Sequence, residues 1–428
     1  MSDLSVKTPV PAAATPAVVT PTSAKPSILF GIVTVLLGVL VLLAPRDEDT
    51  TFRLATDSDF VQLPEITVPA DAATWVLVLL LAACTALAVW QRATGRRTPL
   101  WLTVVFAVAA VTAFLCWAAA GGTLPVIGLL GGAVALAVPL TFGALGGVLG
   151  ERAGVVNIAI DGQLLFGAFA AALVGSIVGS TWAGLAGAMA AGALVALLLG
   201  VFAISYYVDQ VIVGVVLNVL VIGITSFMFS QVLAPNSAEL NSPPRFERMP
   251  IPVLGDIPVV GPILFRQTVL VYLMYAAVAL VAWALYRTKW GLRVRAVGEH
   301  PKAADTVGIN VNRTRYRTLL LGGLIAGAGG ATYTLVSVSQ FNREMTGGAG
   351  YIALAAVIFG KWDPIRATLA ALLFGFASNL QGVLSVLGSP VPSQFMLMLP
   401  YVVTVFAVAG LVGHSRAPAA DGVPYRKA

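Results

Sequence analysis

Charge, histidine and cysteine are scarce in this chain. Only 10% of its 428 residues are charged and 58% are hydrophobic, a balance that excludes an ordinary soluble domain. The two histidines, His300 and His414, are too few for a histidine-rich metal site. The two cysteines, Cys84 and Cys116, each lie within an apolar run and are interpreted as small core hydrophobes, so they do not indicate the redox compartment.

Sequence motifs for catalysis and nucleotide binding are also missing. The nearest approach to a phosphate-binding loop is Gly360-Lys361, which is followed by Trp362 and lacks the upstream glycine. There is no nucleophile elbow, zinc-protease motif or cysteine pair. We therefore expect no enzyme, no cofactor and no ATP hydrolysis by the chain itself. The net charge of +6 reflects membrane topology rather than nucleic-acid binding, because the basic residues lie in loops beside apolar runs.

Long apolar runs are what the sequence has in abundance. A membrane span needs about 20 apolar residues, and the pattern predicts an all-α polytopic membrane protein with 12 spans. The run at 350–361 is too short to cross a membrane alone unless it extends or forms a broken half-helix. The spans are expected at residues 27–44, 74–91, 101–120, 125–149, 156–178, 183–205, 210–233, 267–286, 318–340, 350–361, 365–385 and 395–413.

The charges of the loops predict on which side of the membrane each loop lies, because a surplus of Lys and Arg marks the cytoplasmic side. The segment 45–73 carries seven acids and two arginines and is expected outside. The segment 287–317 carries eight basic residues and two acids and is expected in the cytoplasm, as is the tail 414–428. With residues 1–26 as a disordered cytoplasmic tail, twelve crossings with both termini in the cytoplasm satisfy these loops.

Four polar side chains fall where lipid is expected. Asn157, Asp161 and Gln163 open a span, and Asn218 lies in the middle of another. Polar groups at membrane depth face a cavity or a partner, so we predict that these four residues border a translocation path. Two alternatives stay open: Asp161 lies at the membrane interface, and Asn218 forms a hydrogen bond between helices.

Two regions share one arrangement of residues. The region 143–166 has a Gly-rich span, a charged pair, glycines and a short apolar segment, and the region 322–361 repeats that order. In the predicted topology the two copies have opposite orientations. This suggests an inverted repeat, a common plan of transporters in which the substrate path lies at the repeat interface.

Three ordered motifs resemble those of one family. They are Glu151-Arg-Ala-Gly-Val-Val-Asn-Ile-Ala-Ile-Asp-Gly162, Gly298-Glu-His-Pro-Lys-Ala-Ala-Asp-Thr-Val-Gly-Ile-Asn310 and Gly350-Tyr-Ile-Ala-Leu-Ala-Ala-Val-Ile-Phe-Gly-Lys-Trp-Asp-Pro364. Together they resemble the permease subunits of bacterial ABC importers in the branched-chain amino acid, ribose and nucleoside group. The first motif and Ile257-Pro-Val-Val-Gly-Pro-Ile-Leu264 look most like the nucleoside-type permeases, although Asp161 stands where those members commonly carry Glu.

The resemblance implies how the chain is organised. A ten-span permease core would occupy residues 124–413, after two added spans within the region 27–120. The loop 287–317 would be a cytoplasmic coupling loop that carries a short docking helix bounded by Gly298 and Gly308. The residues that this resemblance assigns to contact with an ATPase are Gly298, Glu299, Pro301, Ala303, Ala304, Gly308 and Ile309.

The resemblance also implies partners and a substrate class. We expect a cytoplasmic ABC ATPase, a second related permease subunit and an extracytoplasmic solute-binding lipoprotein, all at the plasma membrane of a bacterium. Nucleosides are the leading solute, and sugars or amino acids are the alternatives. Two other classes remain: an ion-coupled secondary transporter, with Asp161 as its buried carboxylate, and a scaffold or sensor that transports nothing.

Overall fold

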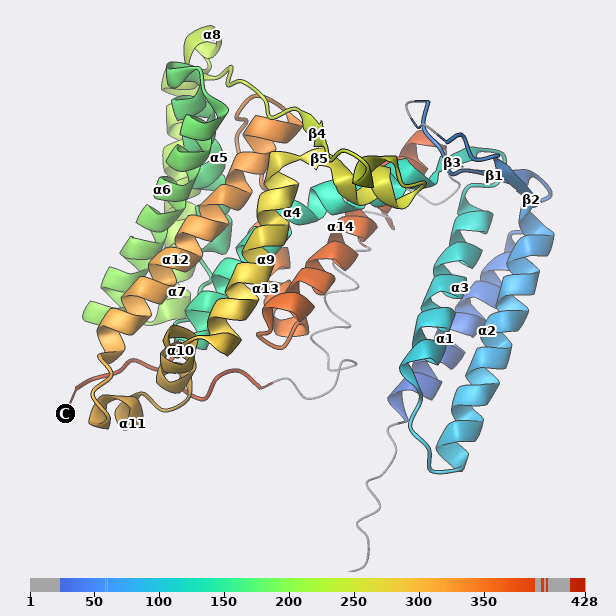
Figure 1. The fold of residues 1–428 in the computed structure, drawn as a ribbon, viewed down its shortest axis with the longest axis horizontal. Helices are drawn as coiled ribbons and strands as arrows, with labels where there is room; N and C mark the ends of the chain where they lie inside the picture. Colours follow the sequence, from blue (N-terminus) through green and yellow to red (C-terminus); the bar gives the residue numbers. More distant parts are fainter. Residues whose placement is uncertain are drawn as a thin grey trace, which may run out of the picture. The chain divides into compact units, whose positions relative to one another are not determined.

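The fold divides into two compact units in a computed structural model, which describes residues 24–57, 59, 61–388, 394–395, 398 and 416–427. The N-terminal unit runs to Glu48 and includes Val68–Trp117. The second unit comprises Asp49–Thr67 and the chain from Ala118 onward. Figure 1 shows the helices of both units.

The N-terminal unit is built from three apolar helices: α1 (Lys25–Leu43), α2 (Ala70–Ala93) and α3 (Leu100–Ala118). Phe30 and Phe106 stack at its centre, with ring centroids 3.9 Å apart. Because α1 begins at Lys25, the tail predicted for 1–26 is two residues too long, and residues 1–23 lie outside the described residues. Since α3 packs in this unit, three helices rather than two precede the permease core.

Short strands interrupt the otherwise helical fold. In the predicted acidic loop 45–73 lie β1 (Asp49–Arg53) and β2 (Ile66–Pro69), and β1 pairs in parallel with β3 (Thr123–Pro125). Further along, β4 (Arg248–Pro250) pairs antiparallel with β5 (Arg266–Thr268). These strands are short and lie in connections, so the all-α prediction for the membrane region is confirmed.

The second unit is a helix bundle, and ten helices in the described part of the chain are long and apolar enough to cross a membrane. Of the twelve predicted spans, the one at 395–413 falls outside the described residues except for single positions. The run at 350–361 is α13 (Ala349–Phe359), an 11-residue half-helix. The long helices of the bundle are α4 (Val126–Arg152), α5 (Ile160–Val178), α6 (Thr181–Gly200), α7 (Gln210–Met228), α9 (Val269–Arg287), α12 (Val311–Thr332) and α14 (Pro364–Val386).

Three of these helices are extended by a π-helical turn. These turns are η1 (Val201–Ser205), η2 (Phe229–Leu233) and η5 (Tyr333–Ser337), which follow α6, α7 and α12. Each turn lengthens its own helix at the C-terminal end. The three spans thereby reach 24 to 27 residues, lengths that suit a tilted crossing.

Helices α4 and α12 cross the middle of the bundle side by side and antiparallel (Figure 1). Gly150 lies beside Leu319, and Gly146 lies beside Gly322, so the residue number falls along α4 as it rises along α12. A Cβ atom on Gly146 would come within 2.6 Å of the Gly322 carbonyl oxygen, and one on Gly322 within 2.7 Å of the Gly146 carbonyl oxygen. The mutual contact of two glycines brings the two backbones together, as small residues do in lipid.

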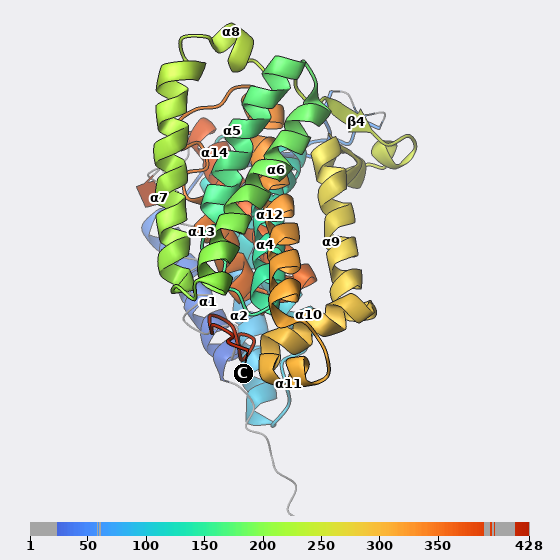
Figure 2. The same ribbon diagram turned by 90° about the vertical axis from the view of Figure 1, so that its left-hand side faces the viewer.

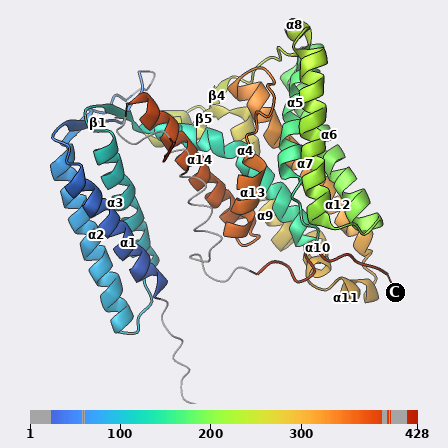
Figure 3. The ribbon, with the colours of Figure 1, turned by 180° about the vertical axis from the view of Figure 1, so that it is seen from behind.

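The helices that follow α4 and α12 repeat one another in opposite directions. α6 lies antiparallel to α12, and α14 lies antiparallel to α4 (Figure 3). The triplets α4–α5–α6 and α12–α13–α14 therefore have the same order and inverted orientation, which supports the inverted repeat. The neighbouring residues are Gly192 with Gly323, Gly200 with Leu319, Gly375 with Ala137 and Asn379 with Leu129.

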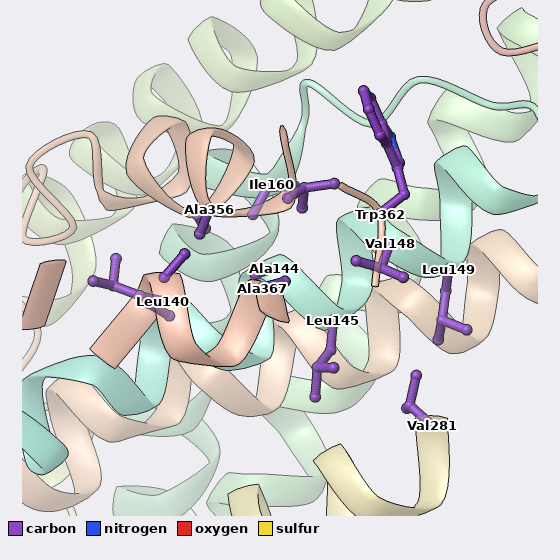
Figure 4. Packing of buried hydrophobic residues seen from close by; sticks show 14 of the residues in the cluster. Leu140, Ala144, Leu145, Val148, Leu149, Ile160, Val281, Ala356, Trp362 and Ala367 are labelled. Carbon is purple, nitrogen blue, oxygen red and sulfur yellow. The ribbon is translucent and has the colours of Figure 1, made fainter. Parts of the chain in front are cut away.

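The largest buried core joins α4, α13 and α14. Figure 4 shows Leu140, Ala144 and Val148 of α4 beside Ala356 and Ala367 from the later repeat. Alanine and glycine on the facing helices keep the helix axes close, whereas leucine and valine fill the remaining space. The core of this unit therefore packs the first repeat directly against the second.

The predicted coupling loop is helical. It forms α10 (Lys289–Glu299) and α11 (Pro301–Thr306), and α12 already begins at Val311 (Figure 2). We call the end of the bundle that carries α10 and α11 the basic end. The opposite end carries α8 (Ser237–Leu240), and we call it the α8 end. The short helix predicted between Gly298 and Gly308 is α11, and His300, with φ −139° and ψ 80°, separates it from α10.

Candidate translocation and coupling sites

The chain breaks between α4 and α5, where the polar residues predicted for the translocation path lie. Gly154 has φ +82°, a conformation that L side chains rarely adopt, and residues 155–157 are not helical. Asn218, which bonds to the first turn of α5, is eight residues into α7, or about 12 Å at 1.5 Å per residue. α5 therefore begins well inside the bundle rather than at its face.

Side-chain amides satisfy the backbone of this break. The Gly162 N–H donates to Oδ1 of Asn218 at 2.8 Å, and Nδ2 of Asn218 donates to the Ile158 carbonyl oxygen at 2.9 Å. Asn157 and Gln163 exchange two amide hydrogen bonds of 3.2 Å each. The predicted alternative for Asn218, a hydrogen bond between helices, is confirmed. These bonds supply the partners that a non-helical backbone needs at membrane depth.

Asp161 links the two halves of the repeat. The residue is 4% exposed, and its Oδ1 accepts a hydrogen bond of 2.9 Å from the backbone N–H of Gly350. Asp161 lies in the first turn of α5 and Gly350 in the first turn of α13, so the N-termini of both helices meet at this carboxylate. The positive ends of helices stabilise a negative charge placed there. Asp161 is buried among protein atoms, and its position at the membrane interface stays an alternative.

The segment that precedes α13 returns into the bundle from the α8 end. Phe341 is fully buried, its backbone N–H donates to Oδ1 of Asn241 at 2.7 Å, and Asn241 directly follows α8. Tyr351, one residue after Gly350, places its hydroxyl 3.1 Å from Nδ2 of Asn218. The break before α13 thus mirrors the break before α5, and Asn218 touches both.

All four residues predicted for the path, Asn157, Asp161, Gln163 and Asn218, are brought together by the fold, and each is at most 4% exposed. They hold two broken helices in register. Sequence reasoning missed Gln210, whose Oε1 accepts from the Val156 N–H at 2.7 Å, and Tyr351. The signal for Gln210 was its place beside Asp209 at a helix start.

The predicted coupling residues divide into buried and exposed positions. Gly298 is buried, and a Cβ atom there would collide with the Arg152 carbonyl oxygen at the end of α4. Ala304 is 3% exposed and packs with Val297 and Val311. These two positions are therefore structural. The remaining residues are exposed at Glu299, Ala303 and Gly308 and half-buried at Pro301 and Ile309.

The C-terminal segment 416–427 packs over this coupling region. The Ala420 N–H donates to the Gly298 carbonyl oxygen at 2.8 Å, and the Ala419 N–H donates to Oε2 of Glu299 at 3.2 Å. Tyr425, which is 7% exposed, joins Val297, Ala304 and Val311 in one apolar cluster. The tail was predicted only as a cytoplasmic end, but it fixes the coupling helices in place.

Arg315 is a buried arginine that the sequence reasoning missed. It is 1% exposed, and its Nη1 donates to the Val423 carbonyl oxygen at 3.0 Å. Asp421 lies close enough to Arg315 and Glu151 to interact with both electrostatically, and burial raises the pKa of Asp421 to about 7 in spite of Arg315. Nε and Nη2 of Arg315, Oδ1 of Asp421 and Oε1 of Glu151 have no hydrogen-bond partner among the described residues.

Glu151 ties this cluster to the late motif. Nε1 of Trp362 donates to Oε2 of Glu151, and Nε of Arg152 donates to the Trp362 carbonyl oxygen at 2.8 Å. The first and third sequence motifs therefore meet at the basic end, and the second motif lies beside them through Gly298. The three motifs, far apart in sequence, form one connected structure from the coupling helices to Asp161.

Comparison with known proteins identifies this arrangement. A family model described as "Branched-chain amino acid transport system / permease component" matches residues 128–408. The chain belongs to this family. It is thus a membrane-spanning permease component rather than an enzyme, and the matched region covers both halves of the repeat but none of the N-terminal helices.

Three curated relatives place the chain within the family. The chain is 43% identical to the guanosine ABC transporter permease protein NupQ of Bacillus subtilis, over 68% of this chain and 94% of that protein. It is 38% identical to the nucleoside ABC transporter permease protein NupC of Lactococcus lactis, over 68% and 93%. It is 37% identical to the putative glucose ABC transporter permease protein TsgC13 of Haloferax volcanii, over 59% and 77%. No solved structure matches.

Proposed function

We propose that this chain is the transmembrane subunit of an ATP-driven importer of nucleosides. The observation that carries the proposal is the 43% identity to a guanosine transporter permease across nearly all of that protein. A second relative, at 38% identity, also carries a nucleoside name. The glucose name of the third relative, at 37% identity over a shorter match, makes a sugar the second candidate solute.

The sides of the membrane follow from charge. The basic end carries the C-terminal segment and most of the eight Lys and Arg residues of 287–317. The positive-inside rule assigns this end to the cytoplasm. The α8 end then faces outward and receives solute from a binding lipoprotein. Both termini lie in the cytoplasm under this assignment, in the plasma membrane of a bacterium.

The chain has no phosphate-binding loop of its own, so a separate ATPase supplies the energy. This ATPase docks on the basic end, which faces the cytoplasm. On α11 the exposed residues Lys302 and Ala303 face away from the packed core, whereas Ala304 faces into it. α10 and α11 rest on Arg152 of α4 through Gly298 and on the C-terminal segment. A push on α11 is thereby transmitted to α4 and to the break that follows it.

The translocation path lies where the N-termini of α5 and α13 meet. Asn157, Asp161, Gln163 and Asn218 hold the break between them, and a movement of α4 against α12 would separate the N-termini of α5 and α13 at the hydrogen bond between Asp161 and Gly350. A second permease subunit of the same family completes the path. Transport then consists of switching between two packings of the same helices.

Uptake by cells tests the substrate. Deleting the gene for this chain should abolish ATP-dependent uptake of labelled guanosine, and a plasmid copy should restore it. Unlabelled nucleosides should compete with the label, and glucose should not. Competition by glucose alone would support a sugar permease, and unchanged guanosine uptake in the deletion strain would contradict the nucleoside proposal.

A further inference from the structure

A cavity of about 300 Å³ opens at the basic end between α10 and the first two turns of α12. Trp290 and Arg293 of α10 line one side, and Arg313 and Arg317 of α12 line the other. The α11–α12 turn, including Gly308, closes the cavity. The lining contains three arginines and no acidic residue, so the cavity suits an anion.

The three arginines of the cavity have no acidic partner among the described residues, where both ion pairs involve Arg266. Arg293, Arg313 and Arg317 are exposed. Their charge is reinforced by the start of α12, whose first backbone N–H groups are only partly capped: Oδ1 of Asn310 accepts from the Arg313 N–H at 2.9 Å. A bound anion would therefore replace water rather than a protein carboxylate.

The cavity lies at the edge of a lipid-facing surface. Arg313, Arg317 and Leu321 are four residues apart on one face of α12, and Leu321 is 42% exposed on a membrane-spanning helix. Figure 2 shows α12 between α6 and α9, with α10 and α11 at its end. On α9, Leu280 and Trp283 are 62% and 59% exposed. The exposed Leu321 thus places apolar surface of α12 one turn from the arginine cavity.

We propose that this cavity binds the phosphate headgroup of an anionic phospholipid. Arg313, Arg317 and Arg293 hold the phosphate, Trp290 lies at the headgroup level where tryptophan is favoured, and the acyl chains run past Leu321. Basic pockets between helices on the cytoplasmic side of a membrane have this chemistry. The bound lipid anchors α10 and the α11–α12 turn to the membrane surface.

The ATPase is the other macromolecule that could reach this end of the bundle, but only Gly308 and Ile309 of its predicted contact residues line the cavity. The exposed residues of α11, which are Lys302, Ala303 and Thr306, do not line the cavity. The lining instead reaches Arg317, and the exposed Leu321 follows one turn later on a helix that is apolar enough to cross a membrane. The position of the apolar surface therefore favours a lipid.

Native mass spectrometry of the full chain released from detergent tests the site. The probes are phosphatidylglycerol and phosphatidylcholine in equal amounts, and inorganic phosphate in a separate arm. The wild-type chain should retain phosphatidylglycerol over phosphatidylcholine. Each arginine near an anionic headgroup contributes a factor of about five, so Arg313→Gln with Arg317→Gln should reduce this preference by about 25-fold.

The matched control is Arg96→Gln with Arg97→Gln, which removes the same charge from exposed positions outside the cavity. It should keep the wild-type preference. Equal preference in the cavity variant and the wild type would overturn the proposal, as would retention of inorganic phosphate without phosphatidylglycerol. In the complex purified with its ATPase, phosphatidylglycerol should remain bound; its loss there would assign the cavity to the ATPase.

Discussion

Asp161 and Gly350 are 189 residues apart in sequence, yet the Gly350 N–H donates to Oδ1 of Asp161 at 2.9 Å in the middle of the bundle. This bond joins the starts of α5 and α13, which run in opposite directions. It makes Asp161 a residue whose acceptor oxygen matters for structure. Ion coupling would instead require the ionisable carboxyl group of Asp161. Substitutions can distinguish the need for an acceptor oxygen from the need for an ionisable group.

Replacing Asp161 tests this distinction. Asp161→Asn keeps an acceptor oxygen for Gly350 and should retain most of the uptake. Asp161→Ala leaves a buried N–H unpaired, at a cost of about 1–3 kcal/mol, and should lower both the melting temperature and uptake. An ion-coupled carrier would instead need the ionisable group, so complete loss of uptake in the stable Asn variant would contradict the present account.

The contact of α6 with α12 depends on glycine. A Cβ atom on Gly192 would collide with the Gly323 carbonyl oxygen, so Gly192→Ala should destabilise the bundle by about 1–3 kcal/mol. Gly223 of α7 has nothing within 4 Å of such an atom, which makes Gly223→Ala the matched control. Thermal unfolding in detergent measures both. Equal melting temperatures of the Gly192→Ala and Gly223→Ala variants would contradict the close contact of α6 with α12.

Exposed positions of α11 should carry the ATPase contact. Ala303→Trp adds bulk at an exposed site and should weaken ATPase association by about tenfold or more, while the melting temperature stays unchanged. Ala93→Trp, at an exposed alanine in the N-terminal unit, is the control and should leave association unchanged. Co-purification with the ATPase is the measurement, and wild-type association of the Ala303 variant would remove the docking site from α11.

Docking of the C-terminal segment should weaken as pH rises. Burial raises the pKa of Asp421 to about 7 when the segment is docked, whereas an exposed Asp titrates near pH 3.9. The docked state binds the proton more tightly, so docking is strongest below about pH 4 and loses stability as pH rises to about 7. The groups that face Asp421 are Arg315 and Glu151.

A spin label at Ala417→Cys, an exposed position in the segment, reports this docking. The label should become more mobile as the pH is raised from about 5 to about 8, and Asp421→Asn should flatten the profile. Tyr425→Ala removes the apolar anchor and should make the label mobile at every pH. A label that stays immobile in the Tyr425 variant would contradict the packing described for this segment.

The sequence predicted the spans well because soluble proteins seldom contain apolar runs of membrane length. Asn157, Asp161, Gln163 and Asn218 were also accessible, since polar groups within such runs need partners. What those partners are depends on distant elements: Asp161 meets α13, and Asn218 meets the start of α5. No local pattern specifies these pairings.

The basic end shows why other features were missed. Arg315 lies between Arg313 and Arg317 and was interpreted as part of a cytoplasmic surface, yet it shares a buried helix face with Val311 and Leu319, four residues to either side. That spacing was the available signal. Gly298 was assigned to ATPase contact, but the close approach of α10 to Arg152 is what requires a glycine there. The docked C-terminal segment had no signal, because short polar tails lack periodicity.

The energy source is the most direct test of the central claim. Proteoliposomes would hold this chain with its ATPase and second permease, or this chain alone, and uptake of labelled guanosine would be measured with ATP or with an ion gradient. The account predicts uptake only by the complete complex with ATP and the binding protein. Gradient-driven uptake by this chain alone would contradict it.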